Sequence, residues 1–368
     1  MMRNGTRRVQ ATLLMSVVAA TLGAQVPDRD VVRSRIAAHL AEGQVAEALA
    51  VYDAHTGVDT SPDVELLGMI ARAELHRQVN ESSPVQRAQV LEILARGDDA
   101  EALKALRAAA GAALPADAAP SQEALAPTIS LARLGDEAAA TRLGVLLGTA
   151  TPDLRVQIIR ALREADARSQ ASRIAALLDD PLPQVQIAAV LATGALQYRP
   201  AIPRLEALFG GGQSTLRLVA AIALKRLGVS SADAFVAKLL ASGVPEVRLM
   251  AAEAFPSADI DQRKEGTRDP RRHWTDSLRE LLDDRNEMVR LKAAEVLACC
   301  DVPAARAVLT GALRDSPVPP MRAEAARILA ATDLSDAALA RQMLGDEAGQ
   351  VRIHGAAAAL RLAQRARR

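Results

Sequence analysis

The chain has 368 residues, with 45 lysines and arginines against 44 aspartates and glutamates, so its net charge is close to zero. This balance lacks the strong positive field that non-specific binding to nucleic acid requires, and it excludes that class of protein. Half of the residues are apolar, but only 2% are aromatic, and alanine and leucine supply most of the apolar side chains. Such small side chains favour many thin helices stacked side by side over one thick core.

The first 24 residues have the pattern of a cleavable export signal. Arg3, Arg7 and Arg8 precede an apolar run, Val9–Ala24, that is short for a membrane span. Removing residues 1–24 leaves 42 basic against 44 acidic residues. We therefore expect an exported protein of the periplasm or cell envelope, with no membrane span in the mature chain. An uncleaved anchor and an ordinary first helix are the alternatives.

Residues 27–110 are predicted to form a small helical region of their own. The segment Gly43–Leu49 is echoed by Gly97–Leu103, 54 residues later. With Leu40 before it and Tyr52 after it, the first copy resembles a tetratricopeptide hairpin, in which the glycine permits a tight turn and an Ala-Leu pair packs the second helix. The usual aromatic residue of the first helix is absent and 54 is not the period of that family, so a generic helical cap stays open as an alternative. Residues 111–121, rich in Ala, Pro and Ser, are predicted to be a linker.

The remaining part, residues 122–368, is built from a short repeat. An aliphatic residue is followed by Arg or Gln and then by an alanine-rich run. The pairs are Leu154-Arg155, Val185-Gln186, Leu216-Arg217, Val247-Arg248, Val289-Arg290, Met321-Arg322 and Val351-Arg352. Their spacings are 31, 31, 31, 42, 32 and 30 residues, and each period reads as two helices separated by a turn, often with proline at the start of the second helix. We predict an all-α fold, a right-handed α-α superhelix of about eight helix pairs, with an insertion at 256–273 where the spacing is 42.

This pattern resembles HEAT repeats, in particular the short form named after phycobilisome lyases. The resemblance rests on Leu281-Leu282-Asp283-Asp284, followed by Val289-Arg290 and Ala293-Ala294. It implies architecture rather than function. It also implies a structural ladder of aspartates and arginines that ties turns to adjacent helices. The predicted ladder residues are Asp283 with Arg290, Asp315 with Arg322, and Asp346 with Arg352.

Two features are candidate binding sites. The first is an apolar column made by the residue after each Arg or Gln. Its members are Val156, Ile187, Leu218, Leu249, Leu291, Ala323 and Ile353, of which Leu218, Leu249 and Leu291 are the candidate binding residues. The column either packs between repeats or lines the concave groove for a partner helix or peptide. The second candidate is the charged insertion with Arg271, Arg272, His273 and Trp274, which either contacts an anionic group or is a solvated loop.

Signals of catalysis are missing from the sequence. There is no HExxH, GxSxG, CxxC or phosphate-binding glycine loop, and none of the five histidines is followed by glutamate. We therefore expect no enzyme, no cofactor and no metal site. The predicted function is a scaffold or adaptor of the bacterial envelope that binds a protein or peptide partner on the concave face. An accessory lyase or other enzyme using that face, or a purely structural spacer, are the alternatives.

Overall fold

The computed structural model describes residues 28–57, 62–111, 120–211, 214–252, 276, 278–298, 302–332 and 334–368. Throughout this part the regular secondary structure is helical, with no strand among the described residues. The predicted all-α solenoid is confirmed. None of the described helices combines the length and the hydropathy needed to cross a bilayer.

The chain divides into two compact units, one of Met1–Asn80 with Ser335–Arg368 and the other of Glu81–Leu334. We call them unit 1 and unit 2. The helices of unit 2 are α5 (Pro84–Arg96), α6 (Ala100–Gly111), α7 (Gln122–Arg133), α8 (Glu137–Leu146), α9 (Pro152–Glu164), α10 (Ala171–Ala175), α11 (Pro183–Ala195), α12 (Ile202–Gly211), α13 (Ser214–Arg226), α14 (Asp233–Leu240), α15 (Pro245–Ala252), α17 (Glu287–Leu297), α18 (Val302–Asp315) and α19 (Pro319–Ala331). Short 3₁₀ turns flank some outer helices: Arg168–Gln170, Ala176–Asp179, Arg199–Ala201, Ser230–Ala232 and Leu281–Asp283.

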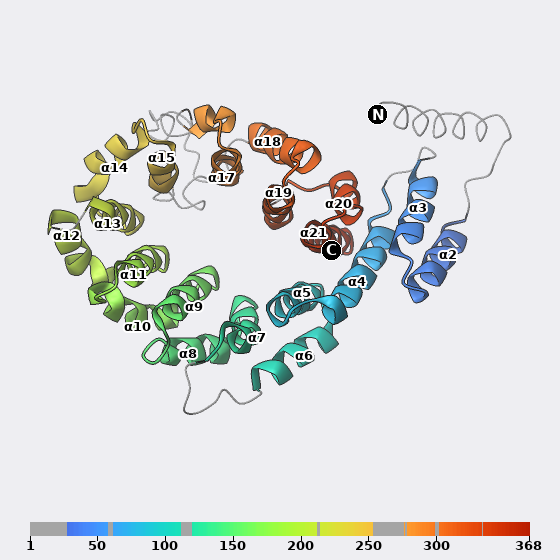
Figure 1. The fold of residues 1–368 in the computed structure, drawn as a ribbon, viewed down its shortest axis with the longest axis horizontal. Coiled ribbons are helices and arrows are strands. Elements are labelled where there is room, and N and C mark those ends of the chain that lie inside the picture. The colour runs from blue at the N-terminus through green and yellow to red at the C-terminus, as the bar shows by residue number, and fades with distance from the viewer. Residues whose placement is uncertain are drawn as a thin grey trace. The chain divides into compact units, whose positions relative to one another are not determined.

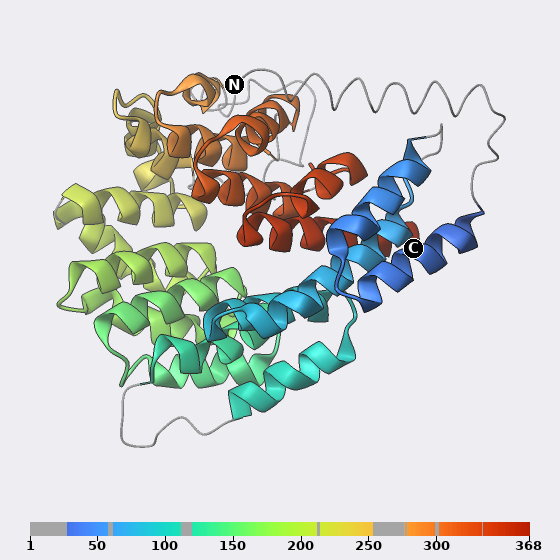
Figure 2. The same cartoon turned by 45° about the vertical axis from the view of Figure 1, so that its right-hand side comes forward.

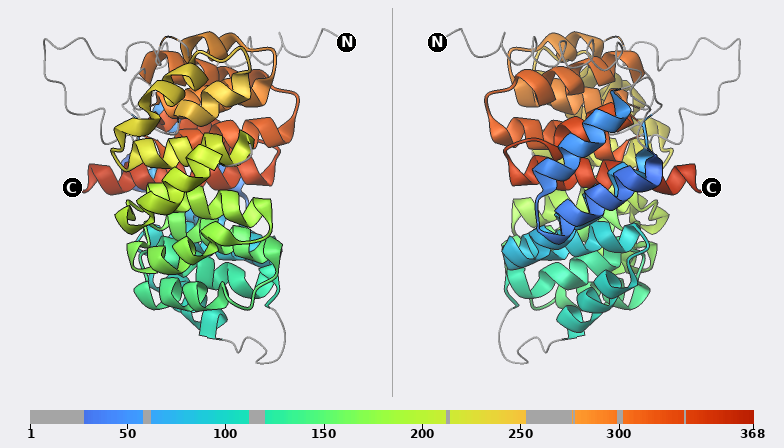
Figure 3. Two further views of the ribbon diagram at one scale, coloured as in Figure 1. Left: turned by 90° about the vertical axis from the view of Figure 1, so that its left-hand side faces the viewer. Right: turned by 90° about the vertical axis from the view of Figure 1, so that its right-hand side faces the viewer.

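Unit 2 is a stack of helix pairs with an inner and an outer row (Figure 1). The inner row contains α7, α9, α11, α13, α15, α17 and α19, and each helix packs against the next one along the row. The outer row contains α8, α10, α12, α14 and α18 (Figure 2). Side views show the hairpins around α9, α11 and α13 as successive layers (Figure 3). The inner row consists of the second helices of the predicted repeats. The side chains on the face of these helices that points away from the outer row form one continuous surface.

The sequence sets both ends of the inner helices. Proline occupies the first turn of α9, α11, α15 and α19, where no intrahelical acceptor is available for its missing N–H. At the other end, a residue with positive φ closes α7, α9, α11 and α13. These residues are Gly135, Asp166, Gln197 and Gly228, with φ of 85°, 48°, 57° and 75°, and each follows the previous one by 31 residues. The period of the sequence is therefore repeated in the backbone, even where the left-handed position is not glycine.

Small side chains let the inner helices approach closely. A Cβ atom at Gly194 of α11 would lie 2.7 Å from Cα and 2.8 Å from Cβ of Ala223 in α13. The neighbours of Ala223 along α13, from Ala220 to Leu224, are at most 1% exposed. The alanine-rich composition therefore allows the helix backbones to lie close together, as the sequence suggested.

Unit 1 brings together helices from both ends of the chain. It contains α2 (Arg29–Ala41), α3 (Val45–Thr56), α4 (Val64–Glu81), α20 (Ala337–Leu344) and α21 (Gly349–Ala366). The turn between α2 and α3 uses Gly43 at φ 74°. A Cβ at Gly68 in α4 would lie 2.9 Å from Cβ of Ala363 in α21, so these two helices are in close contact.

A buried carboxylate joins α4 to α21. Glu74 is 1% exposed and accepts hydrogen bonds from Arg77, from Gln78 at 2.9 Å and from Nε of Arg352 at 2.8 Å. Burial alone would raise the pKa of Glu74, but these donors lower it below its ordinary value. Asp53 and Arg341 form a second contact at 2.6 Å between the N-terminal and C-terminal helices. The last repeat therefore has its outer neighbour in the N-terminal region, which covers a face that an end repeat would otherwise expose.

The domain boundaries drawn from the sequence stay a prediction. They separate residues 27–110 from 122–368 by repeat type, whereas packing groups residues 335–368 with the N-terminal helices. The signal segment 1–24, most of the linker 111–121 and the insertion 256–273 lie outside the described residues.

Candidate functional site

The repeat arginine ties the start of several repeat helices to the turn before it. In four repeats its Nη1 atom donates to the backbone carbonyl of the residue six positions earlier, whereas Arg155 donates from Nε to the carbonyl of Ala150 and from Nη1 to the carboxylate of Asp180. The pairs are Arg248 to Ser242 (2.6 Å), Arg290 to Asp284 (2.7 Å), Arg322 to Ser316 (3.1 Å) and, in unit 1, Arg352 to Asp346 (2.9 Å). Gln186 makes the corresponding bond to the carbonyl of Leu178 at 2.6 Å. These bonds satisfy carbonyls at the end of the preceding helix, which have no partner within that helix.

The acceptor residue also organises the turn through its side chain. Its carboxylate or hydroxyl oxygen accepts the backbone N–H two residues later. The bonds are Asn286 to Asp284 (2.7 Å), Val318 to Ser316 (3.3 Å) and Ala348 to Asp346 (2.8 Å). Asp and Ser are suited to this role because their short side chains reach the backbone locally.

The structure places the acceptors of the ladder differently from the sequence-based prediction. Asp283 and Asp315 were expected to pair with the arginines seven residues later, but the bonds run to the carbonyls of Asp284 and Ser316. The carboxylate of Asp315 instead pairs with its neighbour Arg314 at 2.7 Å. Asp346, six residues before its arginine, does accept from it, through the carbonyl. A carbonyl is present whatever the side chain, so the contact survives where serine replaces aspartate.

One ladder arginine has a different environment. The guanidinium of Arg217 lies 5.0 Å from the ring centre of Phe235 and 5.6 Å from that of Phe209. The two rings pack edge to face at 5.4 Å. Arg217 therefore joins α12, α13 and α14 by cation–π contacts.

The apolar column is half-buried at five of its positions and fully buried at two. The half-buried members are Val156, Ile187, Leu218, Leu249 and Ala323, whereas Leu291 and Ile353 are buried at 0% and 1% exposure. Two of the three candidate binding residues, Leu218 and Leu249, thus reach the inner surface, and Leu291 packs inside the stack. Packing between repeats therefore accounts for Leu291 and Ile353, whereas Leu218 and Leu249 are only half-buried and their role as binding residues stays a prediction.

A small notch opens on the inner surface between α9 and α11. Its volume is about 60 Å³. It is lined by Ile159, Arg160, Arg163, Gln184, Ile187, Ala188 and Leu191. Ile187 of the column forms part of its wall, and its rim is polar and basic. The notch is therefore an apolar depression bordered by two guanidinium groups.

The two arginines of the notch have no ion-pair partner within the described part of the chain. Arg160 is exposed and Arg163 is half-buried on α9. The nearby Glu164 is engaged by Arg133 of α7 at 2.5 Å, which leaves it unavailable to them. Two positive charges therefore face the inner surface uncompensated.

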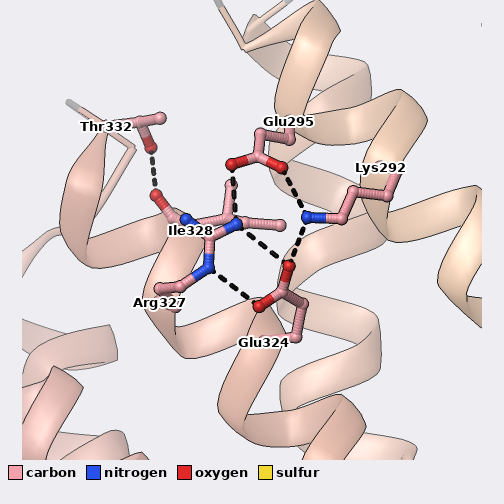
Figure 4. Close-up of polar contacts among 6 residues, drawn as sticks. All are labelled: Lys292, Glu295, Glu324, Arg327, Ile328 and Thr332. Atoms are coloured by element: carbon pink, nitrogen blue, oxygen red, sulfur yellow. Dashed lines mark hydrogen bonds and ion pairs between the residues drawn. The ribbon is translucent and has the colours of Figure 1, made fainter. Parts of the chain in front are cut away.

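The same inner surface carries a closed ion-pair network between α17 and α19 (Figure 4). Lys292 Nζ lies 3.0 Å from Glu295 and 2.6 Å from Glu324. Arg327 lies 2.8 Å from Glu324 and 2.6 Å from Glu295. Two cations and two anions thus alternate around a ring, with two members on each helix.

Each charge of this network stabilises the ionised form of the others. The hydrogen bond from Arg327 is the largest cause that lowers the pKa of Glu324, to about 2, against the opposing effect of burial. Burial would lower the pKa of Lys292, but its bonds to Glu324 and Glu295 raise it. The bond to Glu324 likewise raises the pKa of Arg327. The network is satisfied internally and cross-links two repeats.

Sequence reasoning missed the notch arginines and the network, although a signal for Arg160 and for the network exists. These residues occupy the second and fifth positions after the ladder residue of each repeat. These are Gln157 and Arg160, Ala188 and Leu191, Lys292 and Glu295, and Glu324 and Arg327. Comparing these two positions between repeats would have distinguished the apolar and basic region on α9 and α11 from the charge-balanced region on α17 and α19.

The second sequence candidate, Arg271, Arg272, His273 and Trp274, lies outside the described residues. Among the residues that are described, no group of His, Cys, Asp or Glu side chains is arranged to hold a metal ion.

Comparisons with known proteins follow the repeat pattern. Residues 275–361 match the family model for HEAT repeats. No curated protein sequence matches the chain. Among solved structures, human deoxyhypusine hydroxylase is similar at 18% identity, over 72% of this chain and 97% of that one, with a TM-score of 0.36. The complex of CpcE and CpcF of phycocyanin lyase from Nostoc sp. PCC7120 is similar at 19% identity, over 66% and 92%, with a TM-score of 0.41.

These similarities correct one prediction made from the sequence. The missing motifs led us to expect that the chain is not an enzyme, but the structures with a similar helical stack include a hydroxylase and a lyase. The exclusion was wrong because motifs of other folds say nothing of chemistry on a solenoid surface. At 18% and 19% identity the likeness concerns the fold alone.

Proposed function

Because this chain is a HEAT-repeat protein, we propose that it is a protein-binding scaffold of the bacterial envelope that engages its partner on the inner face of unit 2. HEAT stacks present a continuous surface along their second helices, and extended partners bind to such surfaces. The envelope location rests on the pattern of residues 1–24.

One observation carries this proposal: the half-exposed apolar column on consecutive inner helices. Ile187, Leu218 and Leu249 keep part of their apolar surface in water, although neighbouring positions are completely buried. Covering that surface with a partner removes apolar area from water, which favours association. A few such side chains near the centre of the patch would contribute most of the affinity.

The experiment uses a photoreactive side chain at two positions of the chain. One variant carries it at Leu218 on the inner surface, and the control carries it at Val145, which is 60% exposed on the outer helix α8. After irradiation with the envelope fraction, mass spectrometry identifies crosslinked proteins. We expect a defined protein adduct from position 218 and none from position 145.

A second variant decides whether the adduct depends on the column. Ile187→Ser with Leu218→Ser removes apolar surface while both side chains are only half-buried. Combined with a photoreactive group at Leu249, it should lose the adduct and keep a cooperative melt. Equal adducts from positions 145 and 218, or an adduct that survives both serines, would contradict the proposal.

A further inference from the structure

The notch between α9 and α11 differs from the rest of the inner surface in its charge. Arg160 and Arg163 project beside it without a counter-ion in the described part of the chain, and Glu164, the nearest acid along α9, is already held by Arg133. Guanidinium groups pair well with carboxylates, which can accept two parallel hydrogen bonds. The charge of this region therefore complements an acidic partner.

The floor of the notch defines a second requirement. Ile187, Ala188 and Leu191 of α11 give it an apolar wall, and its volume of about 60 Å³ has room for a side chain rather than for a large ligand. Gln184 at the rim is exposed and offers an amide that can donate and accept hydrogen bonds. An occupant with an aliphatic side chain and an accessible backbone fits these groups.

The charge along α9 also gives the occupant a direction. Asp153 is exposed in the first turn of the helix, about 10 Å along the axis from Arg160 at 1.5 Å per residue. A carboxylate of the occupant is repelled at that end and attracted towards Arg160 and Arg163. The acidic part of the occupant therefore lies towards the C-terminal end of α9.

We infer that the segment bound on the inner face, if the proposed function holds, is an acidic peptide of the partner protein that inserts an aliphatic side chain into the notch and pairs its carboxylates with Arg160 and Arg163. The ionic contacts lie at the rim, so they set selectivity and the salt dependence of association. The contact with Ile187 removes apolar surface from water, and this burial favours binding.

The test uses the full chain and three fluorescein-labelled synthetic peptides that differ only in their charged residues. Leucines are interspersed with glutamates in the first, with glutamines in the second and with lysines in the third. Fluorescence anisotropy at low and high salt measures binding. We expect the glutamate peptide to bind more tightly than the glutamine peptide by roughly tenfold at low salt, with the difference shrinking at high salt, and the lysine peptide to bind most weakly.

A matched pair of charge reversals assigns the effect to the notch. Arg160→Glu with Arg163→Glu should weaken the glutamate peptide by roughly tenfold or more, because two attractive pairs become repulsive. Arg107→Glu with Lys238→Glu makes the same change of net charge on exposed positions of α6 and of the outer helix α14. This control should change binding by less than about twofold.

Equal affinities for the glutamate and glutamine peptides, or equal effects of the two double variants, would overturn the inference. A preference for the lysine peptide would also overturn it. In each case an adduct at position 218, and one at position 249 that is lost with Ile187→Ser and Leu218→Ser, would leave the proposed scaffold function standing. Absence of these adducts as well would remove both.

Discussion

Two regions of the inner surface can be compared at the same two positions of the repeat, and these positions hold different side chains in each region. On α17 and α19, the second and fifth residues after the ladder arginine form a ring of two cations and two anions. On α9 and α11, the same positions hold Gln157, Arg160, Ala188 and Leu191, and the notch opens there. The ladder residue fixes the helix in both regions, so the two following positions are free to differ.

This difference separates contacts that hold the stack from surface left for a partner. Lys292 and Arg327 are neutralised by Glu295 and Glu324, so the network contributes cross-links and offers little unpaired charge. Next to the notch, the close approach of Gly194 to Ala223 holds α11 against α13 without any ion pair. Close backbone packing therefore stabilises the stack beside the notch, as the ion-pair network stabilises it at α17 and α19.

The largest expected effect comes from removing that close approach. Gly194→Ala places a Cβ atom 2.7 Å from Cα of Ala223, and the backbone of α13 cannot rotate away as a side chain could. We expect a loss of about 2 kcal/mol in the free energy of unfolding, measured by urea denaturation. The same substitution at Gly311 of α18 meets no atom within 4 Å. It should stabilise by about 0.5–1 kcal/mol, because alanine is the better helix former.

A loss of stability at both glycines, or at neither, would contradict this account. The first outcome would mean that α18 is also closely packed at Gly311. The second would mean that α11 and α13 are held by contacts other than their small residues.

The fold could be predicted from the sequence because the repeat period appears in side chains that every repeat needs. The pairs from Leu154-Arg155 to Val351-Arg352 mark the starts of the second helices of the repeats, and the structure has a helix at each of them. Most ladder acceptors could not be derived from side chains, because they are carbonyls. The contact of Glu74 with Arg352 joins residues 278 positions apart, and no local pattern predicts such a pairing.

The candidate site could be predicted only in part for a related reason. The column was visible as a run of aliphatic residues, but its exposure depends on how closely neighbouring helices pack. Leu218 is half-buried and Leu291 is buried, although both follow the ladder arginine directly. Burial is a property of the stack, and the identity of one residue does not report it.

A smaller effect is expected when the network of α17 and α19 is titrated. The pKa of Glu324 is lowered from 4.5 to about 2, so its ionised form stabilises the folded protein. That contribution is complete above pH 4.5 and is lost as the pH falls towards 2. Because the network is partly exposed, screening reduces its contribution to about 1 kcal/mol.

Glu324→Gln tests this assignment. The variant should be less stable than the natural chain by about 1 kcal/mol at neutral pH, and the difference should shrink as the pH falls below 4.5. Glu206→Gln on the exposed face of α12 is the matched control and should show a much smaller difference. A difference for Glu324→Gln that does not change with pH would exclude an ionic contribution and leave only a packing effect.

The smallest change in stability, and the sharpest test of the comparison, is a transplant of the network onto the open region. Gln157→Lys, Arg160→Glu, Ala188→Glu and Leu191→Arg reproduce the arrangement of α17 and α19 on α9 and α11. Partly exposed ion pairs contribute little, so the free energy of unfolding should change by less than about 0.5 kcal/mol. Binding of the glutamate peptide should nevertheless be lost, because the notch loses its apolar wall and the new charges neutralise one another. Anisotropy and urea unfolding of the same preparation measure both properties. A transplanted protein that folds normally and still binds the peptide would show that these four positions do not decide whether the surface is open.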